Sequence, residues 1–125
     1  MKYEFLDKID RFYVDEIGWF SDVIEFPSGY GIRVSASSWN SSTPKIDLED
    51  IHDYSHFEVA IVEDGIDVTL GDAVYETYQN VEFDTITNPR LKEIINEYNK
   101  FDNLAYVPVE KVQEIYDIMK KGSII

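Results

Sequence analysis

Both histidines of the chain lie in one short segment, DIHDYSH, which covers residues 50–56. His52, Asp53 and His56 follow the spacing H-D-x-x-H. This resembles the H-E-x-x-H pattern, in which two histidines on one helical face bind zinc and the glutamate is the general base. A metal-dependent hydrolase built on these three residues is therefore one interpretation. It is disfavoured because the chain has no third histidine, and because His56 begins a segment with β-strand alternation, which would break the helical face.

Other residues of this region could also do chemistry, but none forms a specific pattern. Their spacing differs from that of a calcium-binding loop, although four neighbouring acids could in principle hold a hard cation: Asp47, Glu49, Asp50 and Asp53. Any two of the 25 acidic residues could be paired as general acid and base, so such a pair has no specificity. We therefore expect no catalytic residue, no metal and no cofactor, and we expect His52 and His56 to be partly exposed beside carboxylates.

The distribution of acidic residues is the most distinctive feature of the chain. Its 125 residues carry a formal net charge of −14, and residues 46–84 contain no lysine or arginine. Residues 85–125, in contrast, hold equal numbers of acids and bases. We predict that a partner binds the acids of the first stretch: Asp47, Glu49, Asp50, Asp53, Glu58, Glu63, Asp64, Asp67, Asp72, Glu76, Glu82 and Asp84.

Apolar residues are interleaved with these acids, which distinguishes the stretch from a disordered acidic tail. The chain is 44% hydrophobic and 14% aromatic, enough to bury a core in a single domain covering residues 1–125. The absence of cysteine excludes disulfides and is compatible with a reducing compartment. No signal-peptide pattern and no membrane-spanning apolar run is present, so we expect a soluble cytoplasmic protein, in a bacterium or a phage-infected host cell.

The clearest predicted element is a β-hairpin, because Asp64-Gly65 is typical of a two-residue turn with positive φ at both positions. This turn pairs Glu63 with Ile66 and Val62 with Asp67. It also places one set of apolar residues on a common core face: Phe57, Val59, Ile61, Val68 and Leu70.

A second pair of strands is predicted before this hairpin. Residues 22–26 lead through Pro27-Ser28-Gly29 into residues 30–39, where the apolar residues alternate with small and polar ones. The apolar set of the second strand is Tyr30, Ile32, Val34 and Ala36. Residues 40–44 contain no apolar aliphatic or aromatic residue and should form a loop.

Two helices are predicted near the C-terminus. Asn88 can cap a helix that begins at Pro89, with an apolar face of Leu91, Ile94, Ile95, Tyr98 and Phe101. A second helix should cover residues 109–121 and end at Gly122, with an apolar face of Val112, Ile115, Tyr116 and Met119. Residues 104–107 should form a short strand between the two helices.

The N-terminus shows helical spacing at Phe5, Ile9, Phe12 and Tyr13, which predicts a helix that ends before Gly18. Residues 72–83 fit a helix and a strand equally well. Together these elements predict an α+β fold, with an antiparallel sheet of about four to five strands, an N-terminal helix and two C-terminal helices.

The acidic stretch predicts a protein that mimics nucleic acid. Duplex DNA presents one negative charge per roughly 1.7 Å of helix axis, so a rigid array of carboxylates can occupy a basic groove that normally binds DNA or RNA. In size, acidity and lack of cysteine the chain resembles the small acidic inhibitors encoded by phages, such as anti-CRISPR proteins and other DNA mimics. The resemblance implies an inhibitor that blocks the nucleic-acid-binding surface of a nuclease or defence effector.

Two alternatives remain open at this point. An immunity protein that neutralises a basic nuclease toxin would use the same electrostatics with a different partner, and the metal-dependent hydrolase is the second alternative. The net charge argues against direct binding to nucleic acid or to an anionic membrane. The sequence leaves open whether the chain forms a homodimer.

Overall fold

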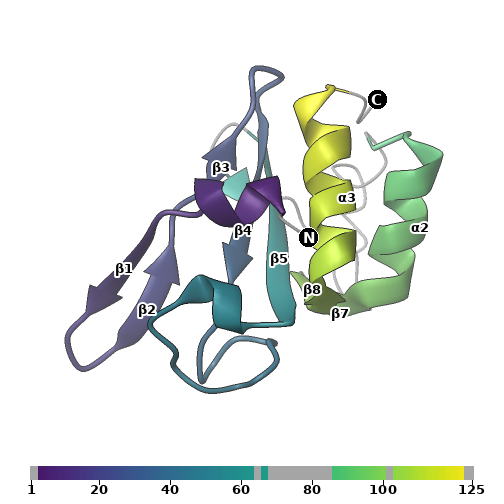
Figure 1. Cartoon of the computed structure of the whole chain (residues 1–125). Helices are drawn as coiled ribbons and strands as arrows, with labels where there is room; N and C mark the ends of the chain where they lie inside the picture. The colour runs from purple at the N-terminus through teal and green to yellow at the C-terminus, as the bar shows by residue number, and fades with distance from the viewer. Residues whose placement is uncertain (1–2, 64–65, 68–85, 101–102, 123–125) are drawn as a thin grey trace.

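The computed structural model describes residues 3–63, 66–67, 86–100 and 103–122. Two α-helices and an antiparallel sheet confirm the predicted α+β class (Figure 1). In chain order the elements are the 3₁₀ helix η1 (Glu4–Lys8), β1 (Arg11–Val14), β2 (Gly18–Ser21), β3 (Ile24–Glu25), β4 (Tyr30–Ser35), the 3₁₀ helix η2 (Ile51–Asp53), β5 (His56–Glu63), β6 (Ile66–Asp67), α2 (Pro89–Tyr98), β7 (Asn99–Lys100), β8 (Asn103–Pro108) and α3 (Val109–Lys120).

The main sheet has the strand order β3-β4-β5-β8-β7, and β5 lies at its centre. The short β6 pairs with the end of β5 in the predicted register, Glu63 with Ile66 and Val62 with Asp67. The turn residues and the predicted pairs beyond Asp67 lie outside the described residues. The predicted pairing of β3 with β4 is also confirmed, with Ile24 opposite Ile32.

One face of this sheet forms the core. The residues predicted for this face from the period of two are buried: Tyr30, Ile32, Val34, Phe57, Val59 and Ile61. Ala60 and Val62, on the opposite face of β5, are buried as well, so burial does not alternate strictly along this strand. Helix α3 packs against β4, β5 and β8, and α2 packs against β8 and α3. The apolar faces predicted for the two helices join the same cluster, apart from Phe101, which lies outside the described residues.

The helix boundaries follow the local signals of the sequence. The Asn88 side chain accepts a hydrogen bond from the Leu91 backbone at 2.9 Å, and Pro89 opens α2 as its first residue. Gly122 follows α3 with a φ of 71°, a conformation that favours glycine. The predicted strand at residues 104–107 is confirmed as β8.

The predicted N-terminal helix is confined to η1, and its extension through Tyr13 is wrong. After Lys8 the chain forms a hairpin in which Phe12 pairs with Phe20 and Tyr13 with Trp19. Aromatic and β-branched residues favour strands, so their helical spacing in this segment was misleading. Gly18, with a φ of 127°, returns the chain into β2.

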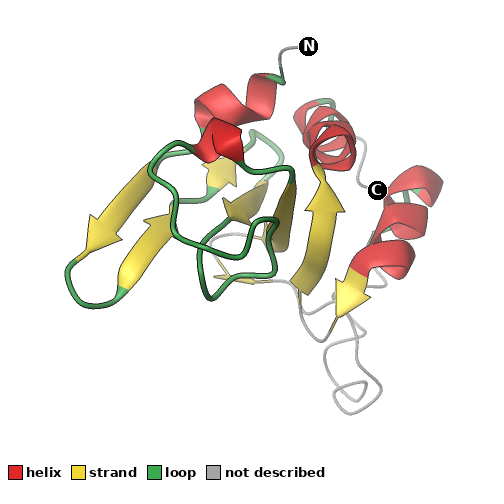
Figure 2. Cartoon of the chain, turned by 60° about the horizontal axis from the view of Figure 1, so that its bottom comes forward, coloured by secondary structure: helices red, strands yellow, loops and turns green. Residues whose placement is uncertain are grey.

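The β1–β2 hairpin forms its own two-stranded sheet and projects from the body of the molecule. Figures 1 and 2 both place it on the opposite side from α2 and α3. The loop from residue 36 to residue 50 lies at the bottom of the molecule in Figure 1, and Figure 2, in which this side comes forward, shows it in green between the hairpin and the helices. The hairpin side therefore presents a surface that the helices leave uncovered.

Residues 72–83, for which helix and strand were equally compatible with the sequence, lie outside the described residues. None of the helices in the described part of the chain is both long and apolar enough to cross a membrane.

Candidate partner-binding site

The structure describes the first half of the predicted acidic site. Four of its acids are exposed in the segment before β5: Asp47, Glu49, Asp50 and Asp53. Glu58 and Glu63 are partly buried in β5. Asp67 is described only as a backbone position of β6. The remaining predicted acids lie outside the described residues: Asp64, Asp72, Glu76, Glu82 and Asp84.

His52 lies between two carboxylates. Its Nδ1 is 2.8 Å from Asp50 Oδ1, and its Nε2 is 3.5 Å from Asp7 Oδ1. The hydrogen bond with the Asp50 side chain raises the pKa of His52, and the charge of Asp50 and the contact with Asp7 act in the same direction. The pKa of Asp50 is lowered, chiefly because its side chain accepts a hydrogen bond from the His52 backbone. The prediction that His52 pairs with carboxylates is confirmed.

His56 does not share a helical face with His52. Asp50 caps the short η2, which contains His52 and Asp53 and ends before Tyr54, whereas His56 is the first residue of β5. The His56 Nδ1 lies 2.8 Å from the Ser55 hydroxyl, and no carboxylate of the described residues is bonded to it. No group of three or more potential ligands that could hold a metal ion is found among the described residues. The H-D-x-x-H spacing therefore does not produce the zinc-binding geometry.

Four carboxylates gather around one broad hollow of about 950 Å³, which we call the acidic groove. Glu49, Asp50 and Asp53 come from the predicted stretch, and Asp7 comes from η1, more than forty positions earlier in the chain. Arg11 and His52 also line it. Sequence reasoning missed Asp7 because only the packing of η1 beside η2 brings it into the groove.

Arg11 of β1 fixes the wall of the acidic groove. Its Nη1 donates to the carbonyls of Leu48 and Glu49 at 2.9 and 3.0 Å, and its Nη2 donates to that of Ala36 at 3.1 Å. The guanidinium carbon also lies 4.5 Å from the centroid of the Trp19 ring. Arg11 therefore ties the hairpin to the acidic segment through backbone oxygens and leaves the carboxylates of the groove exposed.

Two of the predicted acids hold local structure instead. Asp47 accepts hydrogen bonds from the backbone and hydroxyl of Ser38, at 2.9 and 3.3 Å. Glu58 accepts from Asn40 Nδ2 at 3.1 Å and from the Ser41 backbone at 3.2 Å. Both carboxylates thus organise the loop that follows β4.

A second hollow of about 430 Å³, which we call the aromatic cleft, lies beside the acidic groove, and Trp19 lines both. Phe12, Phe20 and Trp39 provide further aromatic lining. Phe20 stacks on Phe12 at a centroid distance of 5.9 Å and meets Trp39 edge to face at 5.3 Å. Phe12 and Trp39 remain 44% and 54% exposed, so these rings present apolar surface to solvent.

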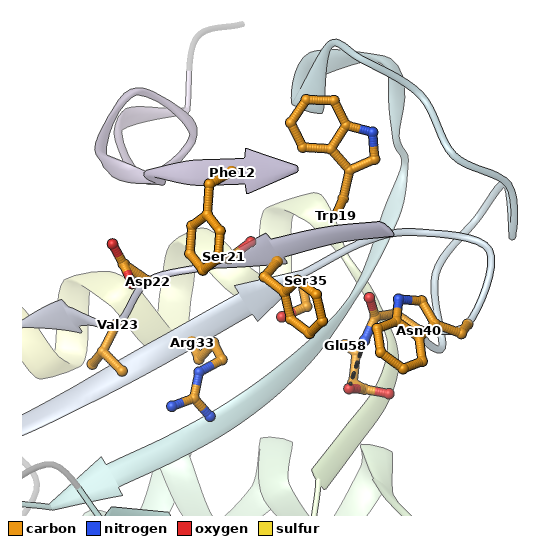
Figure 3. Close-up of a pocket in the computed structure, with 11 residues that line it drawn as sticks. Phe12, Trp19, Ser21, Asp22, Val23, Arg33, Ser35, Asn40 and Glu58 are labelled. Carbon is orange, nitrogen blue, oxygen red and sulfur yellow. Dashed lines mark hydrogen bonds between the residues drawn. The ribbon is translucent and has the colours of Figure 1, made fainter. Parts of the chain in front are cut away.

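Polar side chains complete the aromatic cleft (Figure 3). Asp22 lies at one end, Asn40 and Glu58 lie at the other, and Arg33 lies between them. Arg33 and Glu58 point from the same face of the sheet, because Arg33 pairs with Ala60, two positions from Glu58. No sequence pattern marks this cleft, because β1, β2 and the loop after β4 meet only in the folded chain.

Comparison of the chain with protein-family models, with curated proteins and with solved structures gave no match.

Proposed function

We propose that the protein is an inhibitor that binds the basic, nucleic-acid-binding surface of a nuclease or defence effector through its acidic groove. The observation that carries this proposal is the convergence of four carboxylates from two separate segments in one open hollow. Folding holds these charges together against their mutual repulsion, a cost that a purely solubilising surface does not require.

The electrostatics of the groove support a cationic partner. The groove contains four carboxylates, from Asp7, Glu49, Asp50 and Asp53, and one guanidinium, from Arg11, whose Nη atoms donate to backbone carbonyls. Protonation of His52 would offset one further charge and still leave the groove negative. A surface of this kind speeds association with a basic partner and repels nucleic acid itself.

The test uses a double variant, Glu49→Lys with Asp53→Lys. Neither side chain accepts a hydrogen bond within the described part of the chain, so reversal should preserve the fold. Wild type and variant are immobilised and incubated with bacterial lysate at low and high salt, and each retained nuclease is then assayed for DNA cleavage with the protein added. We expect wild type to retain and inhibit a nucleic-acid-binding enzyme at low salt, and the variant to lose both effects.

The matched control is Asp15→Lys with Glu25→Lys. These two exposed acids line neither hollow, and their reversal changes the net charge by the same amount. The control should keep most of the binding and inhibition. Equal losses of binding and inhibition in the two double variants would show that net charge, and not the acidic groove, determines binding. A wild-type protein that inhibits no retained enzyme would exclude the proposed function.

A further inference from the structure

The aromatic cleft combines two features that suit one kind of side chain. Its walls are aromatic, and Trp39 is more than half exposed, so a large part of this side chain is accessible to a partner. Among the described residues, its charged side chains are Asp22, Arg33 and Glu58, which leave one negative charge in excess. A planar cation can contact an aromatic ring and a carboxylate at the same time, and arginine does this better than lysine.

Glu58 is prepared to accept such a cation. Its carboxylate is held in place by Asn40 and Ser41, each of which donates one hydrogen bond to a different oxygen. Each oxygen has a second lone pair, so the carboxylate can accept further hydrogen bonds. Trp39 precedes Asn40 in the chain, and the ring and the carboxylate line the same cleft.

The chain already binds one guanidinium on this side of the molecule. Arg11 packs its guanidinium over Trp19, with its carbon 5.7 Å from the centroid of Tyr54 as well, and donates to three carbonyls. This internal contact occupies Trp19 and leaves the exposed ring of Trp39 for an external group. A second copy of the chain is a poor occupant, because two molecules of net charge −14 repel each other.

We propose that the aromatic cleft takes an arginine side chain of the partner, with the guanidinium between the Trp39 ring and the Glu58 carboxylate. This inference rests on the proposed function, because it presumes a basic partner. The acidic groove then supplies general attraction, and the cleft supplies the preference for arginine over lysine. Aromatic side chains that bury a partner's arginine are typical anchors of protein interfaces.

The test compares two homopeptides of equal length and charge, one of arginine and one of lysine. Both tryptophans of the chain line the cleft, and Trp19 also lines the acidic groove. The part of the fluorescence change that is lost in Trp39→Ala therefore reports binding at the cleft. We expect both peptides to bind at low salt, and the arginine peptide to cause the larger fluorescence change. The arginine peptide should bind about two- to fivefold tighter, which is the gain expected from a partly exposed cation–π contact.

Trp39→Ala should remove the preference for arginine while leaving the weaker, salt-dependent binding of both peptides. Phe12→Ala, at a second exposed position of the cleft, should reduce the preference for arginine. It provides an independent test in case Trp39→Ala does not fold. Ile46→Ala removes a residue that is 52% exposed but lines neither hollow, and it should keep the preference. Circular dichroism verifies that each variant is folded.

The outcomes separate this inference from the proposed function. Equal affinity of wild type for the two peptides, or an undiminished preference in both Trp39→Ala and Phe12→Ala, would overturn the arginine site and leave a general acidic surface. Failure of wild type to bind either peptide at low salt would overturn the arginine site and the proposed function together.

Discussion

At the scale of single residues, the carboxylates that the sequence presents as one acidic stretch divide into two kinds. Glu49 and Asp53 face the acidic groove without a hydrogen-bonding role among the described residues, whereas Asp47 and Glu58 hold the loop after β4. Asp50 does both, because it lines the groove and caps η2. Charge counts cannot separate these roles, since they depend on which backbone donors lie within reach.

Arg11 should matter for stability more than any exposed charge. Arg11→Lys replaces a planar fork by a single ammonium group, which cannot reach three carbonyls and stack on Trp19 at once. We expect the free energy of unfolding to fall by about 2 kcal/mol, as for the loss of partly buried charge-assisted hydrogen bonds. Urea denaturation measures this change. Lys45→Ala, at an exposed position, serves as the control and should change stability by less than about 0.5 kcal/mol.

His52 should make stability depend on pH near neutrality. Because its pKa is raised in the folded chain, its contribution is complete below the unfolded value of about 6.5 and disappears as pH rises through the folded pKa. His52→Ala should therefore lower the free energy of unfolding more at pH about 5.5 than at pH about 8.5. The opposite order, or a pKa for His52 by NMR that is not above its value in urea, would contradict the assignment.

At the scale of elements, most of the fold could be predicted where local signals and periodicity agreed. Asn88 and Pro89 gave the start of α2, and the alternation of β4 and β5 gave the core face of the sheet. The helix prediction for the N-terminal segment was wrong because Phe12 and Tyr13 are compatible with helical and with strand periodicity. Only their pairing with Phe20 and Trp19 selects the strand. The two hollows could not be predicted, because they are formed by segments that meet only through tertiary packing.

The cap of α2 can be tested with two asparagines of the same segment. Asn88→Ala removes the acceptor for the Leu91 backbone and should lower the free energy of unfolding by about 1 kcal/mol. Asn96→Ala, at an exposed position inside α2, should leave stability unchanged or raise it slightly, because alanine favours helix. Equal effects of the two substitutions in thermal unfolding would show that the cap contributes nothing.

The approach of β3 to β4 makes a further prediction at this scale. A Cβ at Gly31 would lie 2.6 Å from the Ile24 carbonyl oxygen and 2.7 Å from Val23 Cγ1, so Gly31→Ala must displace β3. We expect a loss of about 1–3 kcal/mol, as for other overpacked sites. Chemical denaturation measures it, with Ser35→Ala on the same face of β4 as the control. An unchanged midpoint for Gly31→Ala would show that β3 moves freely.

At the scale of the whole molecule, the charges of the described residues are distributed unequally between two sides. The hairpin side carries the acidic groove and the aromatic cleft, and α2 and α3 lie on the other side with the balanced C-terminal third of the sequence. Electrostatic steering would therefore attract the protein to a basic partner and also turn its hairpin side toward that partner.

Clustering of charge also predicts a stability effect. At low salt, Glu49→Lys with Asp53→Lys should unfold at a higher temperature than Asp15→Lys with Glu25→Lys, because only the first pair relieves repulsion within the groove. High salt screens the carboxylates and should bring the two melting temperatures together. Identical melting temperatures at low salt would show that the groove carboxylates do not repel one another measurably.

The contact between η1 and α3 joins residues near opposite ends of the sequence. The Phe5 backbone donates to Gln113 Oε1 at 3.1 Å, Lys120 Nζ lies 2.8 Å from Glu4 Oε1, and α3 buries Val112, Ile115 and Met119 against the sheet. During synthesis, the ribosome therefore releases the whole sheet before the helix that covers it. We expect the chain to complete its core only after α3 has been translated, and until then its apolar sheet face is exposed to aggregation. The abundant negative charge of the chain should reduce this aggregation by repulsion between molecules, before any partner is bound.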